Sequence, residues 1–114
     1  MLADDLRYHA LKYVQANPQL TQRELAGLLG VSLGRTNYCL KALMDKGLLK
    51  AANFRNSNNK RAYMYKLTPS GLTEKTALAV GFIRRKEHER QQLLREIAEL
   101  RDELKAAAIS DEQP

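Results

Sequence analysis

The sequence contains few of the residues that form metal sites, disulfide bonds and membrane spans. Only one of the 114 residues is cysteine and two are histidine, which rules out an intramolecular disulfide and leaves too few ligands for a Cys/His metal site. The longest apolar stretch is Ala77–Ile83, counting one glycine, whereas a membrane-spanning helix needs about 20 such residues. The N-terminus, Met1–Asp5, has neither the basic nor the apolar segment of a secretion signal. We therefore expect a cytoplasmic protein that does not span a membrane.

Catalytic motifs are absent as well. The sequence has no glycine-rich phosphate loop, no cluster of metal ligands and no nucleophile beside a plausible base. We therefore expect no enzyme activity, no catalytic residues, no metal and no cofactor.

Positive charge is concentrated in the first part of the chain. Residues 1–68 contain 11 Lys and Arg against 4 Asp and Glu, a net of +7, whereas residues 69–114 contain 8 against 9, a net of −1. This asymmetry favours a unit that faces a polyanion, followed by a different, charge-paired unit. A moderately basic protein without such a partner is the plainer alternative.

Three helices are predicted in the first half of the chain, over 4–16, 22–29 and 33–46. Thr21 and Glu24 form a capping box, in which the hydroxyl accepts from the Glu24 amide and the carboxylate reaches back to the backbone. Gly30 ends the second helix, and Val31 is expected to be buried in the turn. Ser32 then caps the third helix.

Two strands are predicted next, after Gly47 ends the third helix in the left-handed conformation. They cover 48–54 and 62–67, and the polar segment Arg55–Arg61 between them is rich in turn formers. Tyr63 and Tyr65 alternate with Met64, as in a strand with two different faces. The segment therefore predicts a β-hairpin with a basic tip.

A long helix is predicted from Pro69 to Ala108, with Thr68 as its N-cap. Its later part carries a seam with the 4-3-4-3 spacing of a coiled coil, formed by Leu93, Ile97, Leu100, Leu104 and Ala107. The polar section 84–90 separates this seam from an earlier apolar stretch formed by Leu72, Thr76, Ala79 and Ile83.

We expect the earlier stretch to pack on the small domain and the seam to pair with a second copy of the chain. The residues assigned to dimerisation are Ile83, Leu93, Ile97, Leu100 and Leu104. A single solvated helix is the alternative. The expected organisation is a small basic domain over 4–68, a dimerisation helix over 69–108 and a frayed tail over 109–114.

This order of elements is that of a winged helix-turn-helix, a mainly α fold with a small β-hairpin (α+β), followed by a long C-terminal helix. The third helix would project its N-terminal outer face, formed by Leu33, Gly34, Arg35, Asn37, Tyr38 and Lys41. In a major groove, Arg pairs with guanine and Asn with adenine. Gly34 lets something approach the backbone closely, either a phosphate or another helix.

Three segments resemble one known family. The segment LTQRELAGLLGVSLGRTNYCLKALMDKGLLK, residues 20–50, resembles the helix-turn-helix of the MarR family of bacterial regulators, and YKLTPSGL, residues 65–72, is similar to its strand-to-helix junction. More narrowly, SLGRTNYCLKAL and NFRNSNNKRAYMY resemble the MarR-family regulators associated with exopolysaccharide (EPS) genes. The resemblance covers about residues 6–104.

The resemblance implies a dimeric transcription factor that binds a pseudo-palindromic site in double-stranded DNA. Position by position, it matches Thr21, Gln22 and Arg23 to the second helix's N-terminus, Ser32, Arg35, Thr36, Asn37 and Tyr38 to the start of the recognition helix, and Arg55–Arg61 to the wing. Together with the outward positions of the third helix, this gives the residues expected to contact DNA: Thr21, Gln22, Arg23, Ser32, Leu33, Gly34, Arg35, Asn37, Tyr38, Lys41, Arg55, Asn56, Asn58, Asn59, Lys60 and Arg61. Family members typically have an additional N-terminal helix at the dimer interface and a pocket for small aromatic ligands. We therefore expect dimerisation to rest on the C-terminal helix, and whether an effector binds stays open.

Several features have plainer interpretations. A winged-helix and coiled-coil adaptor that binds protein partners, without specific DNA readout, is the alternative function. Cys39 fits a small buried core residue better than a redox sensor, Thr36 fits an inward-facing residue, and His88 fits a solvated side chain better than a pH switch.

Overall fold

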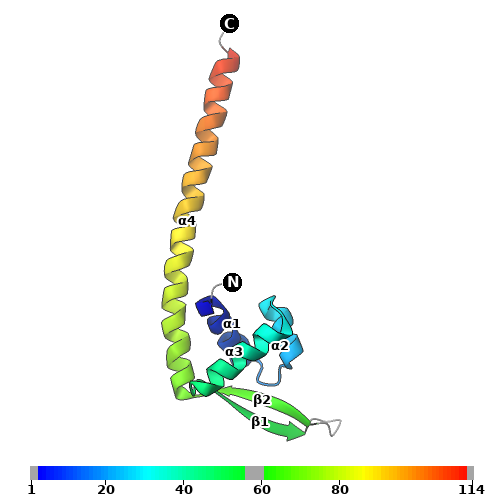
Figure 1. The fold of residues 1–114 in the computed structure, drawn as a ribbon. Helices are drawn as coiled ribbons and strands as arrows, with labels where there is room; N and C mark the ends of the chain where they lie inside the picture. Colours follow the sequence, from blue (N-terminus) through cyan, green and yellow to red (C-terminus); the bar gives the residue numbers. More distant parts are fainter. Residues whose placement is uncertain (1–2, 56–60, 113–114) are drawn as a thin grey trace. The chain divides into compact units, whose positions relative to one another are not determined.

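The computed structural model describes residues 3–55 and 61–112, and of residues 53–55, 61–63 and 109–112 it describes the backbone alone. The order of elements is α-α-α-β-β-α (Figure 1), with bounds α1 Ala3–Ala16, α2 Gln22–Leu29, α3 Leu33–Asp45, β1 Leu49–Arg55, β2 Arg61–Leu67 and α4 Pro69–Glu112. The predicted winged helix-turn-helix followed by a long helix is confirmed. Backbone contacts divide the chain into two units, Met1–Val80 and Gly81–Pro114.

The first unit has one apolar core to which every element contributes. α1 has acidic residues in its first turn, where they favour the positive end of the helix dipole. Its apolar residues recur every three or four positions, which places them on one buried face: Leu6, Ala10, Leu11 and Val14. The core also contains leucines from α2 and α3, together with Leu49, Tyr65 and Leu78.

The two strands form an antiparallel hairpin. Its register runs from the pair Leu49–Leu67 at the base to the pair Arg55–Arg61 at the outer end. Both strands extend one residue further toward the tip than the sequence predicts, and Leu48 precedes the first strand. Tyr65 is buried, and its amide donates to the carbonyl oxygen of Pro18 at 3.0 Å. The hairpin is thereby joined to the loop between α1 and α2.

The junction between the hairpin and α4 is held by the side chain of Thr68. Its hydroxyl donates to the carbonyl oxygen of Gly47 at 2.6 Å and accepts from the amide of Gly71 at 3.0 Å. Its own amide donates to the carbonyl oxygen of Leu48 at 3.1 Å. A Cβ atom at Gly71 would overlap that same carbonyl oxygen. Only glycine therefore allows the first turn of α4 to approach so closely.

The part of α4 that packs on the core differs from the prediction. Leu78 is buried and Ala79 is half-buried, whereas Leu72 and Thr76 are exposed, and Ile83 belongs to the second unit. Leu72 is 45% exposed. The heptad spacing extended backwards from the seam therefore selects the wrong face. The position of this first part is set by the Thr68 and Gly71 contacts with Gly47 and Leu48, which are tertiary and leave no periodic signal.

α4 also ends later than predicted. Its helical backbone runs to Glu112, so 109–112 belong to the helix and not to a frayed tail, and 113–114 lie outside the described residues. The sequence explains this extension. Residues Ala106–Ala108 are alanines, which have the highest helix propensity of any residue type, and no glycine follows them to end the helix. Gly81 leaves the helix continuous, as expected.

Replacing Gly71 should destabilise the first unit. Gly71→Ala puts a methyl group into the carbonyl of Leu48 and should lower the free energy of unfolding by about 3 kcal/mol. The matched control is Gly27→Ala in α2, where a Cβ atom meets nothing within 4 Å. The control should raise stability by about 0.5–1 kcal/mol, because alanine favours a helix. Urea unfolding monitored by circular dichroism would measure both, and equal stability of the two variants would contradict the close approach.

Candidate nucleic-acid interface

The turn between α2 and α3 has the geometry that the sequence predicts. Both hydrogen bonds of the capping box are present, from the Glu24 amide to the Thr21 hydroxyl at 3.0 Å and from the Thr21 amide to the Glu24 carboxylate at 3.4 Å. Gly30 has a φ of 69° and ends α2 in the left-handed conformation. Val31 is half-buried against the core, less than the predicted full burial.

The inner side of α3 packs on the core. Thr36, Cys39, Leu40 and Leu43 are its buried residues. The Thr36 hydroxyl donates to the carbonyl oxygen of Ser32 at 2.9 Å, so this polar side chain is satisfied inside the protein. The Ser32 hydroxyl accepts from the Arg35 amide at 3.1 Å. α3 therefore begins at a fixed residue and with a fixed rotation about its axis.

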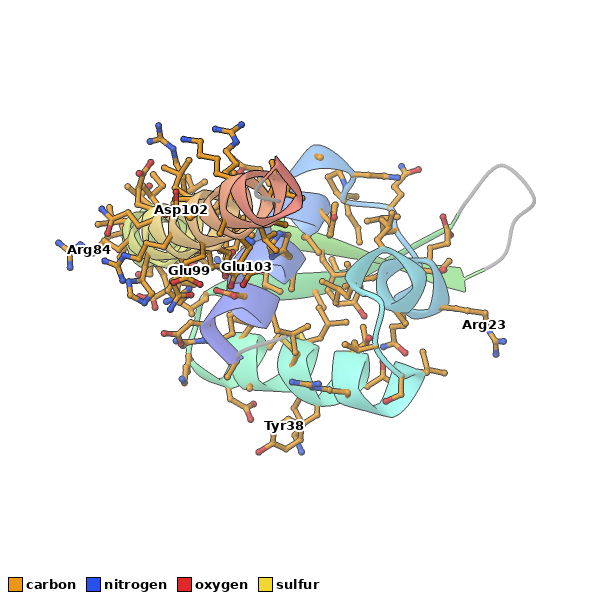
Figure 2. The ribbon with its side chains drawn as sticks, turned by 90° about the horizontal axis from the view of Figure 1, so that it is seen from above. Arg23, Tyr38, Arg84, Glu99, Asp102 and Glu103 are labelled. Carbon is orange, nitrogen blue, oxygen red and sulfur yellow. The ribbon has the colours of Figure 1, made fainter. Side chains whose placement is uncertain are left out.

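The outer side of α3 is exposed over its first turns. Tyr38 is 79% exposed and its side chain points away from the protein (Figure 2). Gly34, Arg35 and Lys41 are also exposed, and Leu33 is 39% exposed. Acidic side chains are absent from this face until Asp45, in the last turn of α3.

Asn37 lies at the edge of this outer face. The residue is half-buried, and its amide oxygen is buried without a hydrogen-bond partner among the described residues. An orphaned buried amide oxygen costs free energy. Asn37 therefore differs from Arg35 and Tyr38, because it needs a rotation of its side chain before it can pair with a base.

The three candidate residues at the start of α2 differ in exposure. Thr21 and Arg23 are exposed, and Figure 2 shows the Arg23 side chain pointing away from the helix. Gln22 is half-buried, and its side-chain amide donates to the hydroxyl of Tyr65 at 3.1 Å. Gln22 is thus fixed by the hairpin, while Arg23 extends into solvent beside the amides of the helix N-terminus.

The described part of the hairpin brings two arginines together. Arg55 and Arg61 are directly opposite each other in the register, at its outer end. The other wing candidates, Asn56, Asn58, Asn59 and Lys60, lie outside the described residues.

A cavity of about 270 Å³ lies beside the outer face of α3, lined by Ala3, Leu6, Arg7, Arg35, Tyr38, Cys39 and Ala42. Arg7 is a residue that sequence reasoning missed. Its guanidinium contacts Asp4 at 2.6 Å and Glu74 at 3.9 Å. No local pattern could reveal this placement, because it depends on how α1 packs against α3.

The seam residues of α4 are exposed in the single chain. Of its four large residues, Ile97 is the least exposed at 42% and Leu104 the most at 71%, with Leu93 and Leu100 between these values. Ile83 is 60% exposed. The residues predicted to pair therefore form a bare apolar face within the part of α4 that belongs to the second unit.

Comparison with known proteins identifies the same fold. Residues 4–50 match the winged helix-turn-helix DNA-binding family. No curated protein sequence matches the chain. Within the described residues, no helix has both the length and the apolar character needed to cross a membrane.

Several solved structures are similar to the chain. MepR of Staphylococcus aureus, a transcription regulator of the multidrug efflux pump MepA, is 24% identical, with a TM-score of 0.54 over 96% of this chain and 79% of that chain. The PcaV transcriptional regulator from Streptomyces coelicolor, solved with its natural ligand, is 23% identical, with a TM-score of 0.57 over 82% of this chain and 72% of that chain. A mutant of MarR from E. coli complexed with operator DNA is 28% identical, with a TM-score of 0.51 over 63% of this chain and 50% of that chain.

These comparisons confirm the predicted resemblance to MarR-type regulators at the level of the fold. The matched family is described as DNA-binding, and the proteins named MepR and PcaV are described as transcription regulators. The chain accordingly carries a winged helix-turn-helix.

Cys39 should be an unreactive thiol in the folded protein. Burial raises the pKa of this thiol, and the positive charges of Arg7 and Arg35 oppose that rise only in part. The reactive thiolate is therefore scarce at pH 8. An aromatic disulfide reagent should label Cys39 slowly in the native chain and rapidly in urea. Because burial raises the pKa of the folded thiol above that of the unfolded one, its contribution to stability is complete below the unfolded pKa and is lost as the pH rises through the folded pKa. Rapid native labelling at pH 8 would contradict this assignment.

Proposed function

We propose that this chain is a sequence-specific, double-stranded DNA-binding transcriptional regulator that acts as a dimer on a pseudo-palindromic operator. The N-terminal half of α3 enters the major groove, the hairpin reaches the adjacent minor groove, and the start of α2 contacts the phosphate backbone. Arg35 reads guanine and Asn37 reads adenine, which are the bases that their donors and acceptors match.

The observation that carries this proposal is the exposed face at the start of α3. Three of its residues, Arg35, Tyr38 and Lys41, are exposed and combine positive charge with an aromatic ring. The opposite side of the helix is buried, and the Ser32 cap fixes its beginning. A rigid, basic, outward-facing helix of this kind suits a major groove, which admits one helix.

Gly34 supports a close approach from outside the chain. A Cβ atom at this position would meet nothing within 4 Å among the described residues. Packing of another helix of the same chain on Gly34 therefore does not explain the glycine. A phosphate or a base edge that approaches the backbone explains the glycine, because the missing side chain leaves room for it.

Basic residues on other elements support contacts with the DNA backbone. Arg23 is exposed at the start of α2, and Arg55 pairs with Arg61 in the backbone register at the outer end of the hairpin. In the proposed complex, these arginines contact the minor groove or the phosphates beside it. Two of the similar solved structures, a mutant MepR with an oligodeoxyribonucleotide and a mutant MarR with operator DNA, were determined in complex with DNA.

The finer parts of the proposal are the dimer, the location and the regulated genes. Dimerisation uses the exposed seam of α4, and we place the protein in the cytoplasm. The assignment to exopolysaccharide genes comes from the resemblance of residues 32–43 and 53–65 to EPS-associated regulators. A small-molecule effector has no assigned site in this proposal.

Selection of bound duplexes from a random pool, followed by sequencing, would test DNA recognition. A regulator should enrich one sequence with two half-sites whose centres are one helical turn apart, about 34–36 Å. Its affinity should fall steeply as salt rises. A winged-helix adaptor that binds only protein partners should enrich no sequence, and that result would overturn the proposal.

Two substitutions should separate base reading from backbone binding. Arg35→Ala should reduce the preference for the selected sequence over random DNA by about 1–3 kcal/mol, because a base contact is lost. Lys60→Ala should weaken binding to all sequences about equally and reduce the salt dependence, because a phosphate contact is lost. Fluorescence anisotropy on selected and random duplexes would measure both variants. Equal losses from both changes on both duplexes would contradict these roles.

A charge in the seam should abolish the dimer. Leu100 is 59% exposed in the single chain, so Leu100→Glu should leave the fold of one chain intact while placing two carboxylates in the paired face. Light scattering should then report a monomer for the variant and a dimer for the native chain. The control is Arg95→Glu, which adds a carboxylate on the side of the helix away from the seam. An unchanged dimer mass for Leu100→Glu would contradict the assignment.

A further inference from the structure

We infer that the exposed seam of α4 binds a second copy of this chain in parallel and in register, so that residue 100 of one copy lies beside residue 100 of the other. This inference rests on the dimer of the proposed function and adds the direction of pairing. The apolar face alone does not decide between parallel and antiparallel pairing. The distribution of charge on either side of that face distinguishes the two directions.

The seam itself has the composition of a two-stranded coil. In heptad terms, where a and d denote the core positions, Ile97 and Leu104 occupy a, while Leu93 and Leu100 occupy d. Ile97, a β-branched residue at a with leucine at both d positions, favours two strands over three or four, whereas Leu104 at the other a position adds nothing to this preference. All four side chains are at least 42% exposed in the single chain, so one further helix can cover them.

The two flanks of the seam carry opposite charges. Glu96 and Glu103 occupy g positions on one flank, and Figure 2 shows Glu99 and Glu103 on the same side of the helix. Arg101 occupies an e position on the other flank, with Lys105 next to it. Within the described part of the chain, none of these side chains has an ion-pair partner.

This charge distribution favours one direction. In a parallel pair the g flank of each helix faces the e flank of the other, so Glu96 of each copy lies beside Arg101 of the other. In an antiparallel pair the g flanks face each other, which would bring Glu96 of one copy close to Glu103 of the other. Parallel pairing therefore gives two attractive contacts, and antiparallel pairing gives two repulsive ones.

The polar section before the seam fixes where pairing begins. Lys86 and Arg90 occupy core positions of the extended heptad, but each is held by an ion pair within its own helix, to Glu89 at 3.2 Å and to Glu87 at 3.3 Å. Like charges at these positions would oppose each other in a parallel pair. The two helices therefore pair from Leu93 onward and separate toward the winged units, which are joined to the same end of both helices.

Disulfide trapping in the full-length chain tests the direction. In a Cys39→Ala background, Ala107→Cys places a thiol at a d position near the end of the seam. Parallel pairing should give a covalent dimer under mild oxidation. Ala106→Cys, one residue away and off the seam, is the matched control and should crosslink at least tenfold more slowly. Antiparallel pairing would separate the two introduced thiols by about 25 Å, roughly 17 residues of helix rise.

A second, mixed experiment detects the opposite arrangement directly. Chains with Ala107→Cys are combined with chains carrying Arg90→Cys, a residue that lies opposite position 107 only in an antiparallel pair. A disulfide between the two different chains would overturn the inference. A disulfide confined to Ala107→Cys pairs would support it.

Charge reversal is an independent test, because it changes the affinity of a parallel dimer and of an antiparallel dimer in opposite directions. Glu96→Lys should weaken a parallel dimer roughly tenfold, because two attractive contacts become repulsive, and it would tighten an antiparallel one. The double variant Glu96→Lys, Arg101→Glu should restore the native dissociation constant, measured by sedimentation equilibrium. A dimer that is tightened by Glu96→Lys would refute the parallel direction and leave the proposed regulator intact. A native chain that stays monomeric and binds selected DNA would refute the dimer itself.

Discussion

The exposure of one side of α3 depends on hydrogen bonds that hold both of its ends. At its beginning, the Ser32 hydroxyl accepts from the Arg35 amide. At its end, the Leu48 amide donates to the carbonyl oxygen of Leu43 at 2.9 Å, and Thr68 donates to Gly47. A helix held in this way needs only its inner side for the core. Its outer side can therefore carry residues chosen for a partner instead of for stability.

Local signals in the sequence predicted the elements and their caps. The capping box of Thr21 and Glu24 fixes the start of α2, and the left-handed glycines at 30 and 47 mark where helices end, because these features depend on neighbouring residues alone. The same reasoning failed for Leu72, which is exposed while Leu78 is buried. Packing of α4 is set by contacts between residues more than 20 positions apart.

The candidate interface was predictable to a similar extent. The rotation of α3 follows from its buried apolar spacing, so the outward direction of Tyr38 and Arg35 could be inferred. The partial burial of Asn37 and the neighbourhood of Arg7 and Arg35 could not, because they depend on where α1 lies against α3. The Gln22 hydrogen bond to Tyr65 joins residues 43 positions apart, and sequence spacing gives no sign of it.

The two units differ in how their surfaces are used. In the first, one apolar core is enclosed, and most of the basic side chains that the structure describes are exposed. In the second, a single helix exposes leucines and isoleucines between an acidic and a basic flank. The sequence of such a helix contributes little stability by itself, because isolated helices are only marginally stable in water.

The hydrogen bond between Gln22 and Tyr65 links the interior of the protein to its surface. The tyrosine is 3% exposed, and its hydroxyl holds a glutamine at the beginning of α2. A shift of that ring, caused by repacking anywhere in the core around it, would move the amide that it holds. In the proposed complex, selectivity for DNA would therefore change during evolution through changes in interior volume, with every residue of the proposed contact surface conserved.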